Sequence, residues 1–239
     1  MAGKTKRPFI KKNNYEEIAW AQNQVICGID EVGRGCLAGP LVTAAVILPP
    51  NTTYRLLKDS KEMTHEERIK AAQWITKNCL YSYGIVHHRL IDTHNIWHAT
   101  LIGMRRAMMN LLATYPHKPH AIVVDAMPLK LTGSCYADIP VHHFPFGEKK
   151  SSSIAAASII AKVKRDEMMQ ITDRIFPNYA WHTNKGYGTA EHKNALDMHG
   201  ATVIHRKTFL KNILRTSEPT ETALEQQYLF APTKEYEIL

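Results

Sequence analysis

The sequence predicts one α/β domain with a mixed central sheet flanked by helices. Two apolar runs, at 24–30 and 41–48, enclose a short glycine-rich segment, which is the pattern of a strand hairpin. Further apolar runs then alternate with segments of helical composition, as expected for strands that return to one sheet through helices. A chain of 239 residues is long enough to enclose one sizeable core.

The chain divides into three parts. Residues 1–23 are expected to be a basic N-terminal arm that ends in a short helix, residues 24–215 the main domain with a small helical segment at its C-terminal end, and residues 216–239 an acidic tail. We expect strands at 24–30, 41–48, 80–87, 121–125 and 140–145, helices near 64–78, 94–114 and 151–176, and two short helices within 186–211. Pro116 and Pro177 end the second and third of the long helices.

The formal net charge of +8 is unevenly distributed, since residues 141–215 carry +6 and residues 216–239 carry −4. A basic body is expected of a protein that binds a polyanion, although charge that only keeps a protein in solution gives the same count. No apolar run approaches the roughly 18–20 residues of a membrane-spanning helix, and the N-terminus lacks the apolar core of a secretory signal. We therefore expect a cytoplasmic monomer that does not bind membranes. The absence of a Cys-x-x-Cys pair argues against a zinc site or disulfide framework among Cys27, Cys36, Cys79 and Cys135.

The segment 28–40, GIDEVGRGCLAGP, joins the first two expected strands and carries charge of both signs. Asp30 and Glu31 are adjacent, so their side chains can converge only if the strand ends or bulges there. Gly33 and Gly35, on either side of Arg34, can expose peptide N–H groups to a close ligand. Carboxylates beside bare amides and an arginine suit a metal ion held against a phosphodiester. The alternative is an ordinary charged hairpin turn.

Two further aspartates are candidate ligands. Asp125 ends the apolar run 121–124, and ligands in α/β sheets gather beyond the carboxyl ends of strands; the alternative is a helix or turn cap. Asp166 follows a stretch of small residues, 155–158, that could pack close to the sheet. Its alternative is an exposed helix face, on which Lys162 and Asp166 form an ordinary i,i+4 pair.

These segments resemble the type 2 ribonuclease H family, in particular ribonuclease HII, over roughly residues 25–211. GIDEVGRGCLAGP is similar to the family's signature, SSSIAAASIIAKVKRD (151–166) to its helix that ends in the last catalytic aspartate, and NKGYGT (184–189) to its KGYGT segment. The resemblance implies a ribonuclease H-like fold. It also implies that four metal-binding carboxylates fall on Asp30, Glu31, Asp125 and Asp166.

Four carboxylates without histidine or cysteine favour Mg²⁺ or Mn²⁺, and two such ions can clamp a phosphodiester. Asp30 is the candidate bridge between them. The resemblance implies an endoribonuclease that cuts on the 5′ side of a ribonucleotide embedded in duplex DNA and degrades the RNA of RNA–DNA hybrids. The products would carry 5′-phosphate and 3′-hydroxyl ends, and the role would be ribonucleotide removal in DNA repair and replication.

The family also implies how the substrate is selected. The backbone at Gly33, Arg34 and Gly35 would read the 2′-hydroxyl, the group that separates RNA from DNA, and Tyr187 would pack on the sugar after the ribonucleotide. A tyrosine between glycines is otherwise a common loop anchor. Candidate phosphate contacts are Lys61, Lys150, Lys162, Lys185 and Arg206. Departures from the family pattern are Cys36, where proline is usual, and Glu148, where aspartate is usual before the basic start of the helix.

The sequence leaves two rival functions open and indicates one protein partner. One rival is the sister enzyme ribonuclease HIII, whose N-terminal substrate-binding domain has no counterpart in the 24 residues before the region of resemblance. The other is a non-catalytic nucleic-acid binder. In the acidic tail, the spacing of Gln226, Leu229 and Phe230 is similar to the short peptide with which bacterial repair proteins dock on the sliding clamp. The alternative is a last helical turn packed on the body.

Overall fold

The structure, a computed structural model, describes residues 12–211 and residue 213. Its centre is a five-stranded mixed sheet with the strand order β3-β2-β1-β4-β5. The strands are β1 Ile26–Val32, β2 Leu41–Ile47, β3 Leu80–Val86, β4 Ala121–Asp125 and β5 Val141–Phe144. Strands β1, β2 and β3 pair antiparallel, whereas β4 is parallel to both β1 and β5. The predicted mixed sheet is confirmed.

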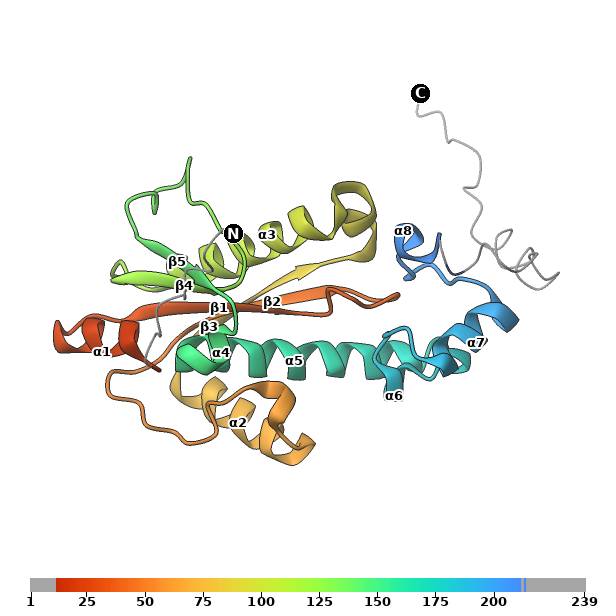
Figure 1. Cartoon of the computed structure of the whole chain (residues 1–239), viewed down its shortest axis with the longest axis horizontal. Helices are drawn as coiled ribbons and strands as arrows, with labels where there is room; N and C mark the ends of the chain where they lie inside the picture. The colour runs from red at the N-terminus through yellow and green to blue at the C-terminus, as the bar shows by residue number, and fades with distance from the viewer. Residues whose placement is uncertain (1–11, 212, 214–239) are drawn as a thin grey trace, which may run out of the picture.

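Helices cover both faces of this sheet. Their bounds are α1 Asn14–Ala21, η1 Ser60–Glu62, α2 His65–Asn78, α3 His88–Thr114, α4 Gly147–Lys150, α5 Ser152–Asp173, η2 Pro177–Tyr179, α6 Trp181–Asn184, α7 Ala190–His199 and α8 Lys207–Leu210. Helix α3 lies on one face and α5 on the other, with α2 packed on the outer side of α5 (Figure 1). None of the helices in the part of the chain described is long and apolar enough to cross a membrane.

The alternation of side chains along β1 explains the two layers. Cys27 and Ile29 are buried in the cluster that includes Met104 and Met108 of α3, while Ile26 packs with the opposite face. Gly28 is needed on that face, because a Cβ there would lie 2.2 Å from the carbonyl carbon of Ser153 in α5. The small residues 155–158 are all buried, so α5 does approach the sheet closely, as expected.

Helix α2 lies where it is expected, whereas α3 differs from the expected helix. Thr64 and Glu67 form a capping box at the start of α2, with each side chain accepting the other residue's peptide N–H. Helix α3 begins at His88, six residues before the predicted start at 94, and its backbone is interrupted at Asn95, where φ is 60°. The Asn95 side chain accepts the peptide N–H of His98 at 3.1 Å and so begins the second part of the helix. The helical periodicity in the sequence belongs to this second part.

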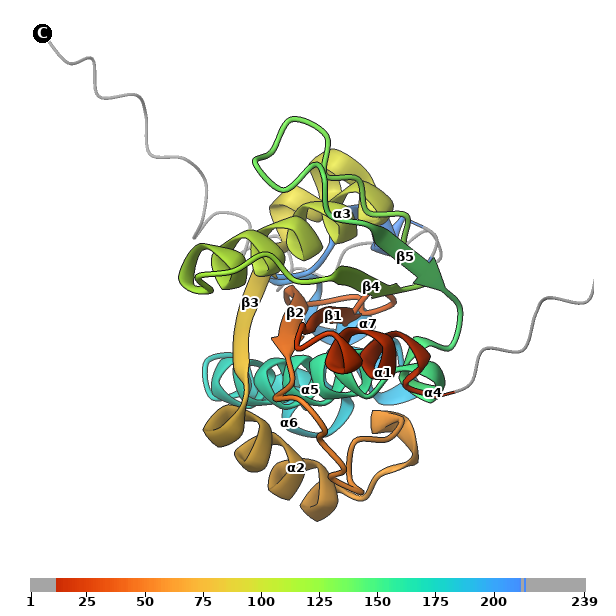
Figure 2. The ribbon, with the colours of Figure 1, turned by 90° about the vertical axis from the view of Figure 1, so that its left-hand side faces the viewer.

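Both ends of the main domain are tied to α5. Figure 2 shows α1 at one end of the molecule with α4 beside it, and the peptide N–H of Asn13 donates to the Lys150 carbonyl at 2.7 Å. At the other end, η2 to α8 pack on Met169 of α5 through buried Tyr179, Trp181 and Leu196. This C-terminal segment places residues 184–189 beside residues 36–39 of the hairpin loop, since the peptide N–H of Leu37 donates to the Gly186 carbonyl at 2.8 Å.

Candidate active site

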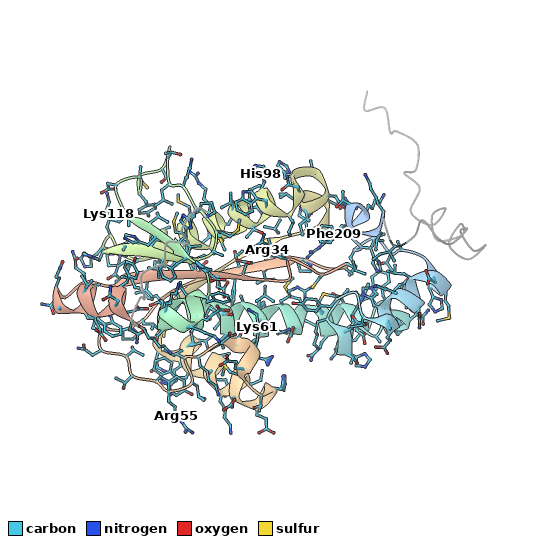
Figure 3. All side chains as sticks on the ribbon, in the orientation of Figure 1. Arg34, Arg55, Lys61, His98, Lys118 and Phe209 are labelled. Carbon is cyan, nitrogen blue, oxygen red and sulfur yellow. The ribbon has the colours of Figure 1, made fainter. Side chains whose placement is uncertain are left out.

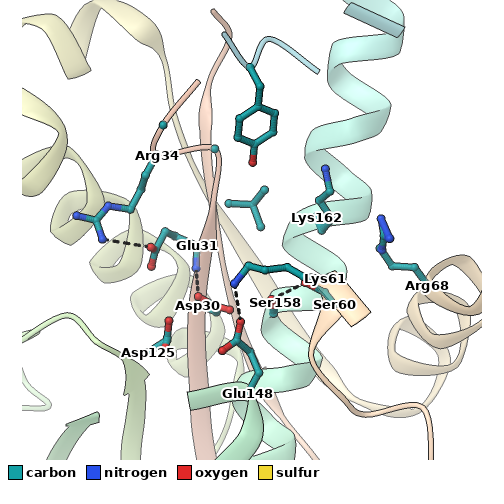
Figure 4. Close-up of a pocket in the computed structure, with 14 residues that line it drawn as sticks. Asp30, Glu31, Arg34, Ser60, Lys61, Arg68, Asp125, Glu148, Ser158 and Lys162 are labelled. Carbon is teal, nitrogen blue, oxygen red and sulfur yellow. Dashed lines mark hydrogen bonds and ion pairs between the residues drawn. The ribbon is translucent and has the colours of Figure 1, made fainter. Parts of the chain in front are cut away.

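A cavity of about 280 Å³ opens at the carboxyl ends of β1 and β4 and faces α5 (Figure 4). Two of its lining residues, Arg34 and Lys61, lie near the middle of the molecule in Figure 3. Lys118 and Phe209 lie to either side of them. The cavity's lining residues come from β1, the hairpin loop that follows it, η1, α2, β4, α4, α5 and the C-terminal segment: Asp30, Glu31, Val32, Gly33, Arg34, Gly35, Ser60, Lys61, Arg68, Asp125, Glu148, Ser158, Lys162 and Tyr187.

Three carboxylates meet in the floor of this cavity. The parallel register pairs Ile29 of β1 with Val124 of β4, so Asp30 and Asp125 follow side by side at the end of both strands. Glu148 reaches the same point from α4. Oxygen atoms of Asp30, Asp125 and Glu148 lie within 4.8 Å of one another. Sheet topology therefore brings together side chains that are far apart in the sequence.

The burial of these carboxylates makes their charge costly. Asp30 is only 3% exposed, and its pKa is raised well above the ordinary value by desolvation and then by the neighbouring charges of Glu31, Asp125 and Glu148. Burial also raises the pKa of Asp125, although the peptide N–H of Gly147 donates to its Oδ1 at 2.7 Å and opposes this shift. A bound cation would relieve the repulsion.

Glu31 lines the cavity but points differently from Asp30. Strand β1 continues to Val32 without a bulge, so these successive side chains start on opposite faces. Burial raises the pKa of Glu31 to about 7, while the nearby guanidinium of Arg34, 3.5 Å from Oε1, works in the opposite direction. Among the residues described, its Oε2 is buried without a hydrogen-bond partner. An oxygen ligand left unsatisfied beside three carboxylates fits a hard divalent cation.

The structure does not bring Asp166 into this group. Its Oδ1 accepts from Lys162 Nζ at 2.7 Å, which is the ordinary i,i+4 pair, and Asp166 is not among the residues that line the cavity. Glu148 is the fourth carboxylate of the cavity instead, and it is only 4% exposed. The structure therefore places Glu148, and not Asp166, where the fourth predicted ligand would be expected. Glu148 stood out in the sequence only as a departure from the family's aspartate.

Lys61 stands at the edge of the acidic cluster. The Oγ atoms of Ser60 and Ser158 are 3.0 Å apart, and this hydrogen bond attaches η1 to α5. Lys61 follows directly and its Nζ lies 3.3 Å from Glu148 Oε1, while its side chain remains 80% exposed. A cation held in this way can contact a bound phosphate as well as the carboxylate. Arg68 of α2 also lines the cavity and was not identified from the sequence.

The predicted substrate-reading residues line the opposite side of the cavity. Gly33, Arg34 and Gly35 form a turn there, and Tyr187 lies near α5 with its ring centroid 5.9 Å from Lys162 Nζ. Burial raises the pKa of Tyr187 to about 12, so its phenol stays protonated at neutral pH. These residues and the acidic cluster thus line the same cavity.

Three of the predicted phosphate contacts lie elsewhere. Lys150 Nζ sits 5.2 Å from the ring centroid of Phe144, and Lys185 Nζ donates to the His182 carbonyl, neither of them lining the cavity. Arg206 is completely buried, and its side chain donates only to backbone carbonyls among the residues described. The prediction that Arg206 contacts phosphate directly is wrong in this structure, because solvent does not reach its guanidinium.

The chain is similar to known proteins over most of its length. The sequence model described as Ribonuclease HII matches residues 27–213. Ribonuclease HII of Levilactobacillus brevis is 44% identical over 202 residues, which cover 84% of this chain and 75% of that protein. The solved structure of the PCNA:RNase HII complex from Archaeoglobus fulgidus has a TM-score of 0.63 at 23% identity, covering 82% of this chain and 98% of that one. Bst-RNase HIII in complex with Mn²⁺ has a TM-score of 0.57 at 22% identity, covering 80% and 67%. The two structures share the fold.

Proposed function

The chain belongs to the ribonuclease HII family, whose members are endoribonucleases that act on RNA–DNA hybrids, and we propose the following substrate and metal-binding residues for it. It hydrolyses the phosphodiester on the 5′ side of a ribonucleotide embedded in duplex DNA, as well as the RNA strand of hybrids. It leaves 5′-phosphate and 3′-hydroxyl ends and serves ribonucleotide removal in DNA repair and replication. The cluster of Asp30, Asp125 and Glu148 at the strand ends is the observation that carries this proposal.

Divalent ions, Mg²⁺ or Mn²⁺ and two per site, would be held by Asp30, Glu31, Asp125 and Glu148. The all-oxygen donor set and the unsatisfied Oε2 of Glu31 support this assignment, and Asp30 is the most buried of the candidates for a shared ligand. When bound, such ions activate a water molecule and stabilise the leaving oxygen. Bst-RNase HIII, which shares the fold, was solved in complex with Mn²⁺.

The chain's own residues would position the nucleic acid. The backbone at Gly33, Arg34 and Gly35 contacts the ribonucleotide, where a 2′-hydroxyl distinguishes RNA from DNA. Tyr187 packs on the next sugar. Lys61 lies beside the acidic cluster and Lys162 beside the Tyr187 ring, and both contact the phosphates. Lys150 and Lys185 remain candidates for phosphates farther along the duplex.

The deciding experiment is a cleavage assay on a DNA duplex with one ribonucleotide, run in Mg²⁺, in Mn²⁺ and in EDTA. We expect one cut on the 5′ side of the ribonucleotide with either ion and none in EDTA. An all-DNA duplex of the same sequence is the control substrate. Cleavage in EDTA would overturn the metal assignment, and equal cleavage of both duplexes would overturn the substrate.

Docking on a sliding clamp through Gln226–Phe230 is a second proposal, and these residues lie outside the described part of the chain. The spacing of the tail motif supports it, and the A. fulgidus protein forms a complex with PCNA. Calorimetric titration of the full chain against a bacterial clamp should give a heat of binding that L229A/F230A lacks. No binding at high micromolar concentration would favour a tail packed on the body. We also propose that the enzyme is a cytoplasmic monomer, on the grounds of composition alone.

A further inference from the structure

Two completely buried arginines lie under the substrate side of the cavity. Arg165 belongs to α5 and Arg206 immediately precedes α8, and both side chains are 0% exposed. No carboxylate in the described part of the chain forms an ion pair with either guanidinium. A buried charge without a counter-charge is costly unless hydrogen bonds replace its water. The hydrogen-bond acceptors of these guanidiniums therefore indicate the role of the two arginines.

Arg165 donates to backbone carbonyls of two separate segments. Its Nε donates to the Pro40 carbonyl at 3.0 Å and its Nη2 to the Ala38 carbonyl at 3.2 Å, both at the end of the hairpin loop. Its Nη1 donates to the Lys185 carbonyl at 2.8 Å. Lys185 directly precedes Gly186 and Tyr187. One planar guanidinium thus holds the hairpin loop and the residues around Tyr187 at a fixed distance.

Arg206 binds both the start and the end of the hairpin loop. Its Nη1 donates to the Arg34 carbonyl at 2.9 Å, and its Nε and Nη2 donate to the Gly39 carbonyl at 3.2 and 3.1 Å. The Arg34 carbonyl is accordingly turned toward the interior. Among the described residues, the peptide N–H groups of Arg34 and Gly35 have no hydrogen-bond acceptor. They remain available to a ligand in the cavity that these residues line.

Arg165 also touches both of the elements that would read the substrate, which we name the substrate turn (residues 33–35) and the tyrosine loop (residues 184–189). A Cβ on Gly33 would lie 2.2 Å from Arg165 Nε, so the guanidinium lies directly under the turn, where φ of Gly33 is +95°. The Arg165 Cζ is 5.7 Å from the centroid of the Tyr187 ring. This is within the range of a cation–π contact.

We propose that Arg165 is a positioning residue that sets the substrate turn and the tyrosine loop in register, with Arg206 holding the Arg34 carbonyl of the turn inward. The inference rests on the proposed function, because it assigns the selection of the ribonucleotide to this register. Neither guanidinium touches the substrate. Their contribution is to fix the distance between the backbone that reads the 2′-hydroxyl and the ring that packs on the next sugar.

The geometry requires a guanidinium rather than any cation. Three carbonyls from two segments lie in the reach of one rigid, planar set of donors. A lysine ammonium keeps the charge but is a point donor on a flexible stem. Arg165→Lys therefore separates the two contributions, since it preserves the electrostatic potential and removes the fixed geometry. Lys164→Arg is the matched control, because Lys164 is the adjacent, exposed-side cation of α5 and pairs with Glu167.

The test compares cleavage of a duplex with one ribonucleotide against cleavage of a long RNA–DNA hybrid, at a temperature well below each variant's unfolding midpoint. For R165K we expect kcat/KM on the single-ribonucleotide duplex to fall about tenfold or more relative to the hybrid. K164R should keep the wild-type ratio. Equal losses on both substrates, or an unchanged ratio, would overturn the proposal.

A double-mutant cycle adds a readout that a merely structural role would not move. If Arg165 acts through Tyr187, the effects of R165K and Y187A on the selectivity ratio will be less than additive. Strict additivity would overturn the coupling. Should R165K fail to fold, R206K answers the same question from the other end of the turn, and failure of both to fold would make the pair structural. Failure of the proposed function is distinguishable from failure of this inference. In the first case the wild-type enzyme would not prefer the duplex with one ribonucleotide over an all-DNA duplex.

Discussion

At the scale of single residues, the choice between Glu148 and Asp166 decides the composition of the proposed metal site. Glu148 lies with Asp30 and Asp125 in the acidic cluster, whereas Asp166 is satisfied by Lys162 on the helix surface. A carboxylate that holds a divalent ion cannot lose its charge without loss of the ion. A carboxylate in a partly exposed i,i+4 pair contributes little to the free energy of unfolding.

We therefore expect E148Q to lower the cleavage rate by orders of magnitude in saturating Mg²⁺, and D166N to change it no more than a few-fold. D125N should resemble E148Q and still bind the duplex, because the phosphate repulsion is reduced. Single-turnover cleavage and duplex binding in EDTA measure the two effects. The assignment fails if D166N is as slow as E148Q.

At the scale of elements, the N-terminal helix stabilises the start of α5. Glu16 is completely buried, and its Oε1 accepts from the Ser151 hydroxyl at 2.5 Å and from the Ser153 peptide N–H at 3.1 Å. The Asn13 side chain accepts from the Ser152 N–H at 2.9 Å. A carboxylate at a helix N-terminus satisfies free donors and interacts favourably with the helix dipole. Because Glu148 lies only a few residues before this start, α1 also supports the proposed active site.

Glu16→Ala should reduce the free energy of unfolding by about 1–3 kcal/mol, because the Ser153 N–H is left buried without an acceptor. Urea unfolding followed by circular dichroism measures this change. Glu66→Ala is the control, because Glu66 also lies in the first turn of a helix, α2, but is exposed. Equal stability of the E16A and E66A proteins would exclude this role of α1.

Most of the secondary-structure elements could be predicted from the sequence, but the shortest helices could not. Apolar runs predicted all five strands, and helical composition predicted the position of α2. The single-turn helices α4 and α6 were missed because four residues carry no periodicity. Glu148 lies in α4, which explains its omission from the predicted ligands. Burial of Arg165 and Arg206 could not be predicted either, since a basic residue is ordinarily exposed and only the tertiary fold supplies their carbonyl partners.

At the scale of the whole molecule, two buried groups of opposite kind respond oppositely to pH. His192 and His205 are both buried, with their Nε2 atoms 3.0 Å apart, between α7 and the segment before α8. Desolvation, and then the neighbouring His192, lowers the pKa of His205 to about 3, and desolvation lowers that of His192. Burial raises the pKa values of Asp30, Glu31 and Asp125 in the acidic cluster.

The sign of each effect follows from which state binds more protons. An unfolded histidine titrates near pH 6.5, but His205 in the folded protein stays neutral down to about pH 3. As the pH falls between these values, the unfolded state binds more protons and stability is lost. The carboxylates contribute in the other direction, because their stabilising protonated form is lost as the pH rises through about 7 for Glu31. A divalent ion should compensate for this second loss at neutral and alkaline pH.

We expect the acid side of the stability profile to depend on the histidine pair. On lowering the pH from 7 to 5, each buried histidine below its unfolded pKa should lower the free energy of unfolding by up to about 1.4 kcal/mol per pH unit. The carboxylates of the acidic cluster oppose this change over the same range, so the histidine contribution is read from the difference between two proteins that share the cluster. In His205→Gln, the unfolding midpoint measured in EDTA should fall less over this range than in the wild-type protein, even if the variant is less stable throughout. His65→Gln is the control, because His65 is exposed at the start of α2. Parallel wild-type and H205Q profiles between pH 7 and 5 would show that another group governs the acid lability.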